Sequence, residues 1–170
     1  MKKDFVAPVL ALTLVCLIMS GALALGNSIT QPIIEEAAAE RAENARRDII
    51  PEADGFELLE IEMPGGVTEA YRATNGTGYI FMVSAYGYGG EIKMICGVDP
   101  AGAIIKSTVL AHNETQGLGT VVFDRAGEYE GRSNLENIDA IAGATITSNA
   151  YKNGIADALE AFKIIEGAES

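Results

Sequence analysis

The stretch from Glu91 to His112 reads EIKMICGVDPAGAIIKSTVLAH, and it decides the fold of this chain. Two mainly apolar runs flank Asp-Pro-Ala-Gly, a group of residues that is typical of a tight turn. Upstream, EAYRAT (69–74) and YIFMVSAYG (79–87) read as strands separated by Asn-Gly-Thr-Gly, a turn of the Asn-Gly type. The four segments together predict an antiparallel meander.

Toward the C-terminus, from Ile146 to Ile165, the pattern becomes helical. Charged residues fall on one side of the predicted helix and apolar residues on the other, as in an amphipathic helix that covers a sheet. The predicted apolar side consists of Tyr151, Ile155, Ala158, Leu159, Phe162 and Ile165. The fold class that we predict is therefore α+β, an antiparallel sheet with a C-terminal amphipathic helix.

The N-terminal segment predicts a membrane anchor. Val6 to Gly26 are 21 uncharged residues, which as a helix span about 31 Å, close to the hydrocarbon thickness of a bilayer. Lys2 and Lys3 precede the run, so the positive-inside rule places the N-terminus in the cytoplasm and the rest across the cell membrane. A cleaved signal peptide is the alternative; we favour the anchor because the apolar run is longer than a usual signal-peptide core.

The segment after the anchor is rich in alanine and carries Glu43 four residues before Arg47, the favourable order for a helical ion pair. We expect a juxtamembrane helix that ends near Pro51. The sequence thus divides into a transmembrane anchor (1–26), a stalk helix (27–54) and one folded domain (55–170).

Composition excludes several functions. The formal net charge of −12 would repel nucleic-acid phosphates. Cys16 lies in the apolar segment and Cys96 in a predicted strand, and neither has the spacing of a metal site. We find no catalytic triad, so we expect neither catalytic residues nor a metal in this chain.

The stretch IDAIAGATITSNAY, Ile138 to Tyr151, places an excess of short polar residues at the start of the predicted helix. A helix that begins near Thr145 presents free backbone N–H groups and the positive end of its dipole, which suit a phosphate. Gly143 and Ala144 keep the approach uncrowded. From the residues alone, simple helix capping is the better explanation of the stretch.

The loop HNETQGLGT, 112–120, has glycines on both sides of Leu118, so its backbone can approach a flat ligand with Leu118 as an apolar contact. The alternative is an ordinary connection, with His112 as a solvated strand end and Glu114 as a surface charge.

Residues 86–119, YGYGGEIKMICGVDPAGAIIKSTVLAHNETQGLG, together with DAIAGATITSNA at 139–150, resemble the FMN-binding domain family. The likeness is closest to the G subunits of Rnf-type ion-translocating ferredoxin:NAD oxidoreductase complexes, and the C subunits of sodium-pumping NADH:quinone reductases are related. The family pattern is Asp, two variable residues, Ser or Thr, then Gly-Ala-Thr, and it falls on Asp139 to Thr145. Two residues depart from it: Ala142 replaces the Ser or Thr, and Gln116 replaces a proline in the loop.

The resemblance implies that FMN is attached covalently, by a phosphodiester bond to the hydroxyl of Thr145. Thr147 and Ser148 would then supply caps and hydrogen bonds around the phosphate. The predicted cofactor-binding residues are Thr145, Glu114, Thr115, Gly117, Leu118, Gly119, Gly143, Ala144, Thr147 and Ser148.

The implied function is that of a membrane flavoprotein subunit, which passes electrons within a redox-driven ion-translocating complex and holds no complete active site of its own. The implied partners are the other membrane subunits, a flavin transferase during maturation, and membrane lipid around the anchor. The alternatives are an anchored flavin- or phosphate-binding sensor without electron-transfer turnover, and a purely structural adaptor.

Overall fold

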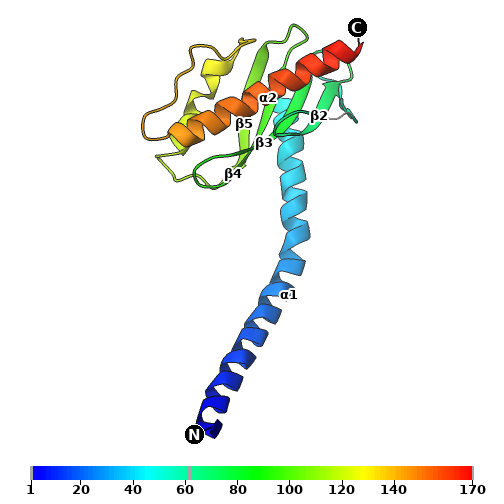
Figure 1. The fold of residues 1–170 in the computed structure, drawn as a ribbon. Coiled ribbons are helices and arrows are strands. Elements are labelled where there is room, and N and C mark those ends of the chain that lie inside the picture. Colours follow the sequence, from blue (N-terminus) through cyan, green and yellow to red (C-terminus); the bar gives the residue numbers. More distant parts are fainter. Residues whose placement is uncertain (1, 61–62, 170) are drawn as a thin grey trace. The chain divides into compact units, whose positions relative to one another are not determined.

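A computed structural model describes residues 2–60 and 63–169 (Figure 1). The elements in chain order are α1 (Lys2–Ile49), β1 (Phe56–Leu58), β2 (Val67–Ala73), β3 (Tyr79–Tyr86), β4 (Glu91–Val98), β5 (Ile104–His112), the 3-10 helix η1 (Thr120–Tyr129) and α2 (Thr145–Glu169). The chain divides into two compact units, residues 1–41 and 42–170. The predicted α+β class is confirmed.

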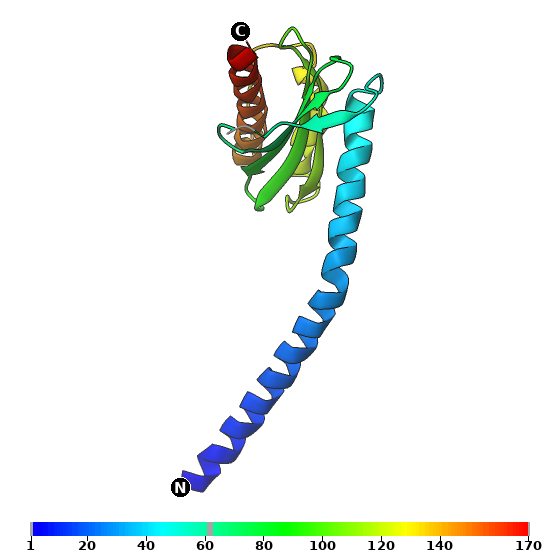
Figure 2. The ribbon, with the colours of Figure 1, turned by 90° about the vertical axis from the view of Figure 1, so that its right-hand side faces the viewer.

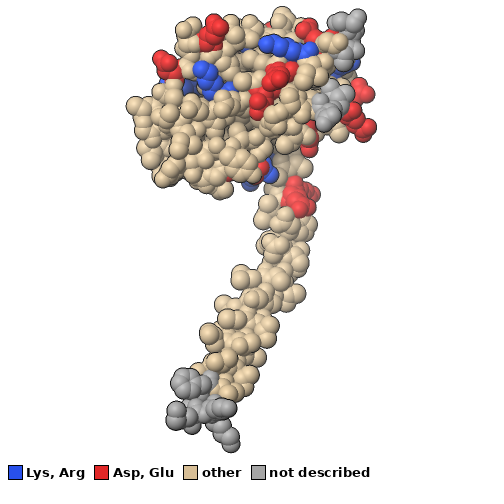
Figure 3. Space-filling model, viewed as in Figure 1, with Lys and Arg blue, Asp and Glu red and all other residues tan. Residues whose placement is uncertain are grey.

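The first unit is helical and apolar. The helix contains one stretch long and apolar enough to cross a membrane, with a mean hydropathy of 2.4 in its most apolar window. The large apolar side chains between Val6 and Ile34 are exposed, and Figure 3 shows no charged side chain along most of this part of the helix on the face in view. Such a surface is unfavourable in water, which indicates membrane association.

The second unit is built on a five-stranded antiparallel sheet in the order β1-β2-β3-β4-β5. Strands β2 to β5 are joined in sequence order by short turns, so the predicted meander is confirmed. Both predicted turns contain a glycine with positive φ, Gly76 (φ 73°) and Gly102 (φ 83°), a conformation that other residues adopt at a cost. Sequence analysis did not predict β1, which has three residues and pairs with the end of β2.

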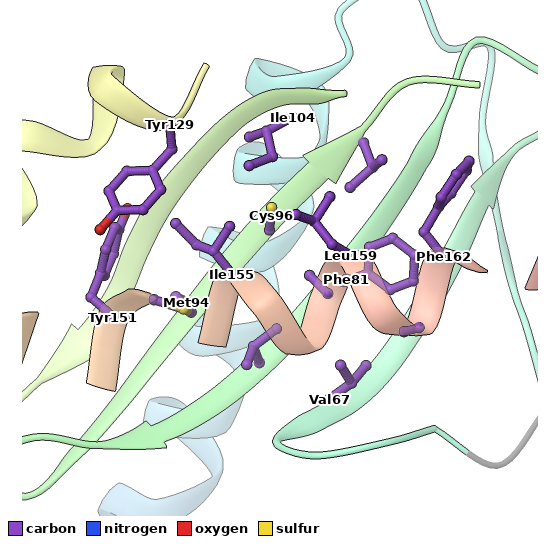
Figure 4. Close-up of a cluster of buried hydrophobic side chains, with 14 of the residues drawn as sticks. Val67, Phe81, Met94, Cys96, Ile104, Tyr129, Tyr151, Ile155, Leu159 and Phe162 are labelled. Atoms are coloured by element: carbon purple, nitrogen blue, oxygen red, sulfur yellow. The ribbon is translucent and has the colours of Figure 1, made fainter. Parts of the chain in front are cut away.

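One face of the sheet is covered by α2. The six residues predicted as the apolar side of this helix are all buried. Figure 4 shows Tyr151, Ile155 and Leu159 of α2 close to side chains of the sheet, including Met94 and Cys96 of β4. The hydroxyl groups of Tyr151 and Ser107 form a buried hydrogen bond of 2.8 Å, which satisfies both polar groups inside the core.

The opposite face of the sheet is covered by the last residues of α1, which belong to the same compact unit (Figure 2). Ile49 and Ile50 form a second buried cluster with Ile80 and Ile95, which alternate with the side chains that face α2. The Nζ atom of Lys106 lies 2.7 Å from Oδ2 of Asp48. Because both of its faces are covered there, β4 is apolar and buried from Met94 to Val98.

Two further predictions concern α1. Arg47 forms the predicted ion pair with Glu43, at 3.0 Å. The helix continues without interruption through the predicted stalk and ends at Ile49, two residues before Pro51.

Candidate functional site

A cavity of about 420 Å³ lies where three segments of the second unit meet. These segments are the β3–β4 turn, the loop that follows β5, and the first turn of α2. The lining residues are Tyr88, Glu114, Thr115, Leu118, Gly119, Gly143, Ala144, Thr145, Ile146 and Thr147. The volume is in the range of small-molecule sites.

The first turn of α2 forms one wall of the cavity. Gly143 turns the chain with a φ of 87°, and the helix begins two residues later at Thr145. The first helical hydrogen bond runs from the Ser148 N–H to the Ala144 carbonyl, at 2.8 Å. The N–H groups before Ser148 have no partner within the helix, so this wall offers backbone donors and the positive end of the dipole.

Glu114 joins the three segments. Its side chain is buried, and each carboxylate oxygen accepts a hydrogen bond. The Thr147 hydroxyl donates to Oε2 at 2.8 Å, and the Gly89 N–H donates to Oε1 at 2.9 Å. Among the described residues that line the cavity, Glu114 alone carries a charge. Glu114 was predicted to contact a ligand. In the structure, both of its carboxylate oxygens already accept hydrogen bonds from the protein.

The loop after β5 is a compact turn. The Thr115 carbonyl accepts hydrogen bonds from the N–H groups of Leu118 (3.1 Å) and Gly119 (2.9 Å). The Gly117 N–H donates to the Thr120 hydroxyl at 2.9 Å. Replacement of the family proline by Gln116 therefore leaves a hydrogen-bonded loop, with the exposed Leu118 side chain lining the cavity.

Eight of the ten predicted site residues line the cavity. Gly117 and Ser148 do not. Gly117 is exposed at the tip of the loop, while the Ser148 hydroxyl accepts a hydrogen bond of 3.1 Å from the Ile141 N–H and supports the turn before α2.

Sequence analysis missed two lining residues, Tyr88 and Ile146. Tyr88 is an aromatic residue between two glycines in the run YGYGG. This pattern indicates a glycine loop in which a tyrosine side chain is free to contact a ligand. Ile146 is an apolar residue that lies off the buried side of α2, and its exposed fraction is 55%. Both signals were available in the sequence.

The comparisons with known proteins agree on one family. The profile described as FMN-binding domain matches residues 87–160. The G subunit of the proton-translocating ferredoxin:NAD(+) oxidoreductase complex of Clostridium ljungdahlii is 29% identical, over 93% of this chain and 91% of that protein. The G subunit of the Na(+)-translocating ferredoxin:NAD(+) oxidoreductase complex of Acetobacterium woodii is 28% identical, over 91% and 89%. The G subunit of the ion-translocating oxidoreductase complex of Shewanella piezotolerans is 32% identical, over 91% and 88%.

The chain belongs to the FMN-binding domain family and, within it, to the G subunits of ion-translocating oxidoreductase complexes.

Two features of the cavity suit FMN. Tyr88, Leu118 and Ile146 provide apolar surface for a flat ring. The first turn of α2 suits a phosphate, and its first residue, Thr145, is exposed. Apolar side chains and the N-terminal turn of α2 thus line one cavity.

Proposed function

We propose that this chain is the membrane-anchored flavoprotein subunit of a redox-driven ion-translocating complex of the Rnf type. In this proposal FMN is attached to Thr145 by a phosphodiester bond. Three observations support it: the membership of the FMN-binding domain family, the similarity to G subunits over most of their length, and the candidate membrane span in α1.

The choice of Thr145 rests on the contrast with Thr147. Both threonines line the cavity. Thr145 is exposed, whereas Thr147 has an exposed fraction of only 1% and its hydroxyl donates to Glu114. A transferase needs an accessible hydroxyl, so Thr145 is the better acceptor. This contrast is the observation that carries the assignment.

The departure at Ala142 is compatible with attachment. Ala142 is exposed and does not line the cavity, so the loss of a hydroxyl there leaves the walls around Thr145 unchanged.

FMN supplies the electron-transfer chemistry when it is bound. The residues of this chain position it. The α2 N-terminus stabilises the charge of the phosphodiester, while Leu118 and Ile146 shield the ring from water. Attachment keeps the flavin at a fixed effective concentration near its redox partners, which matters for a domain outside the cytoplasm.

The anchor and the charges beside it define the proposed topology. Lys2 and Lys3 favour an N-terminus in the cytoplasm, and in this proposal residues 1–26 lie in the membrane and the flavin domain lies outside. Residues 27–54 connect the two, and the last part of this segment, from Ala42, packs on the sheet. We propose that a flavin transferase acts on the exported domain and that the other subunits determine the coupling ion.

Intact mass of the membrane-purified chain tests this proposal. The chain is expressed with a flavin transferase and with the other subunits of its complex. We expect the mass of the polypeptide plus one FMN minus one water, with the N-terminal anchor retained. Co-purification of the other membrane subunits supports a complex. A bare polypeptide mass contradicts the covalent flavin, and a flavin-loaded chain without partners favours the sensor alternative.

A further inference from the structure

The Glu114 carboxylate is positioned as a support rather than as a ligand. It accepts hydrogen bonds from Thr147 and Gly89 on its two oxygens, and its exposed fraction is 8%. A carboxylate has no donor to offer a phosphate, and both groups are negatively charged. The contacts of Glu114 therefore hold protein segments together.

The segment held by Glu114 is the β3–β4 turn. Gly87, Gly89 and Gly90 have no side chains with which to fix this turn, and within the turn the Gly87 N–H donates to the Gly90 carbonyl at 2.9 Å. The bond from Gly89 to Glu114 ties the turn to the loop after β5. Tyr88, directly before Gly89, lines that cavity although its exposed fraction is 75%.

The glycines allow this close approach. A Cβ atom on Gly87 or on Gly119 would collide with the Glu114 carboxylate, and one on Gly89 would collide with the backbone of Asn113. The turn, the carboxylate and the loop after β5 thus pack without side chains between them. This packing explains why YGYGG and GLG accompany the glutamate in the sequence.

We propose that Tyr88 covers the isoalloxazine ring of the flavin and that Glu114 is the positioning residue that holds Tyr88 there. The inference rests on the proposed function. A tyrosine ring at the mouth of an apolar cavity provides a flat surface for an aromatic ligand. Glu114 acts through the Gly89 N–H on one side and fixes the first turn of α2, through Thr147, on the other.

Flavin fluorescence tests the role of Tyr88. A phenol in contact with an excited flavin quenches its emission, because it donates an electron to the ring and then recovers it. We expect Tyr88→Phe, which keeps the ring but removes the phenol, to raise the emission of the folded protein several-fold relative to the same sample after denaturation. Tyr86→Phe is the matched control, since Tyr86 is equally exposed but does not line the cavity. Unchanged emission in Tyr88→Phe, or an equal rise in Tyr86→Phe, overturns the inference.

Two variants of Glu114 separate the effect of side-chain length from the effect of charge. Glu114→Gln keeps the length of the side chain, so its carbonyl can accept from Gly89 and its amide can donate to Thr147. Glu114→Asp keeps the charge but is one methylene group too short to bridge both. We expect wild-type quenching in Glu114→Gln and several-fold brighter emission in Glu114→Asp. The reverse order, or wild-type quenching in both, contradicts the positioning role.

The same samples distinguish a failure of attachment from a failure of the Tyr88 contact. Flavin that stays on the denatured chain reports attachment, and the ratio of folded to denatured emission reports Tyr88. A wild-type chain without covalent flavin overturns the proposed attachment and this inference with it. A chain with covalent flavin and an identical ratio in all variants overturns this inference alone.

Discussion

At the scale of single residues, the site depends on how two chemically similar side chains are placed. Thr145 and Thr147 are two positions apart on α2, yet Thr145 is exposed, whereas Thr147 is buried and its hydroxyl donates to Glu114. Residue type alone does not distinguish them, whereas burial and hydrogen bonding do. Leu118 shows the same principle, because its position between two glycines leaves it exposed at the cavity.

Leu118→Asp should lower the midpoint potential of the flavin. A negative charge beside the ring disfavours the negatively charged reduced forms, and about 1 kcal/mol of such repulsion corresponds to about 20 mV for a two-electron couple. A spectroscopic redox titration measures the shift. Leu118→Asn is the control, since it has nearly the same shape without the charge. A potential equal to that of the Asn variant would place Leu118 away from the ring.

At the scale of elements, local sequence patterns predicted the strands, turns and helix face that depend on neighbouring residues. The alternation and turns of β2 to β5 and the apolar side of α2 follow from residues close in sequence, and the structure confirms them. Three features were not predicted. Strand β1 is too short to show a period, the 3-10 helix η1 was overlooked between the loop after β5 and α2, and the packing of Ile49 and Ile50 on the sheet is a long-range contact.

The candidate site was predictable to a similar degree. Glycine-rich loops and the polar start of α2 indicated which segments take part, because these residue types have specific backbone roles. The hydrogen bonds of Glu114 to Gly89 and Thr147 join residues far apart in sequence, so no local pattern indicated them. Tyr88 was missed although the run YGYGG marks its turn, because the contact of that turn with the cavity depends on the bond from Gly89 to Glu114.

The end of α1 should be required for stability of the folded domain. Ile49 and Ile50 are almost fully buried, and loss of both contacts costs about 3–5 kcal/mol. We expect the fragment 42–170 to unfold at a clearly higher temperature than the fragment 55–170, which exposes Ile80 and Ile95. Circular dichroism measures both melting curves. In the longer fragment, Asp48→Ala is the control, because removing an exposed ion pair costs less than about 1 kcal/mol. Equal melting temperatures of the two fragments contradict the packing role.

The buried core beneath α2 should make the domain sensitive to alkaline pH. Burial raises the pKa of the Cys96 thiol to about 12, and burial also raises the pKa of the Tyr151 phenol. In the unfolded chain a thiol titrates near pH 8.5. Because the folded pKa is higher, the stabilisation is complete below about pH 8.5 and is lost as the pH rises toward 12.

Urea unfolding at pH 8 and pH 10 measures this loss. We expect a fall of about 2 kcal/mol in the free energy of unfolding, at about 1.4 kcal/mol per pH unit above the unfolded pKa. Cys96→Ala lowers the stability at both values but should reduce the difference between them. An equal free energy of unfolding at the two pH values in the wild type would contradict the buried thiol.

At the scale of the whole molecule, the chain combines an apolar anchor with an acidic domain. The uncharged run from Val6 to Gly26 suits a lipid environment. The net charge of −12 comes from the rest of the chain, which suits water. In the proposed topology a covalently held flavin matches that arrangement, since a domain outside the cell has no cytoplasmic pool from which to replace a lost cofactor.

Protease access tests the proposed orientation. Trypsin added to cells without their wall should cut after exposed arginines such as Arg41 and Arg47 and release the flavin domain. Inverted vesicles should protect these sites, because the domain then lies inside the vesicle. Detergent-solubilised protein is the control for cleavage itself. Protection in whole cells with digestion in inverted vesicles would reverse the topology.

Covalent attachment at Thr145 is tested by in-gel flavin fluorescence of the denatured chain, followed by mapping of the labelled peptide. Expressed with a flavin transferase, the wild type should give a fluorescent band, since a phosphodiester bond survives unfolding. Thr145→Val removes the acceptor oxygen and keeps nearly the same shape, so the domain should fold and the band should be absent. A band that persists in Thr145→Val but is lost in Thr147→Val would place the flavin two residues further along α2, and a wild type without a band would contradict covalent attachment altogether.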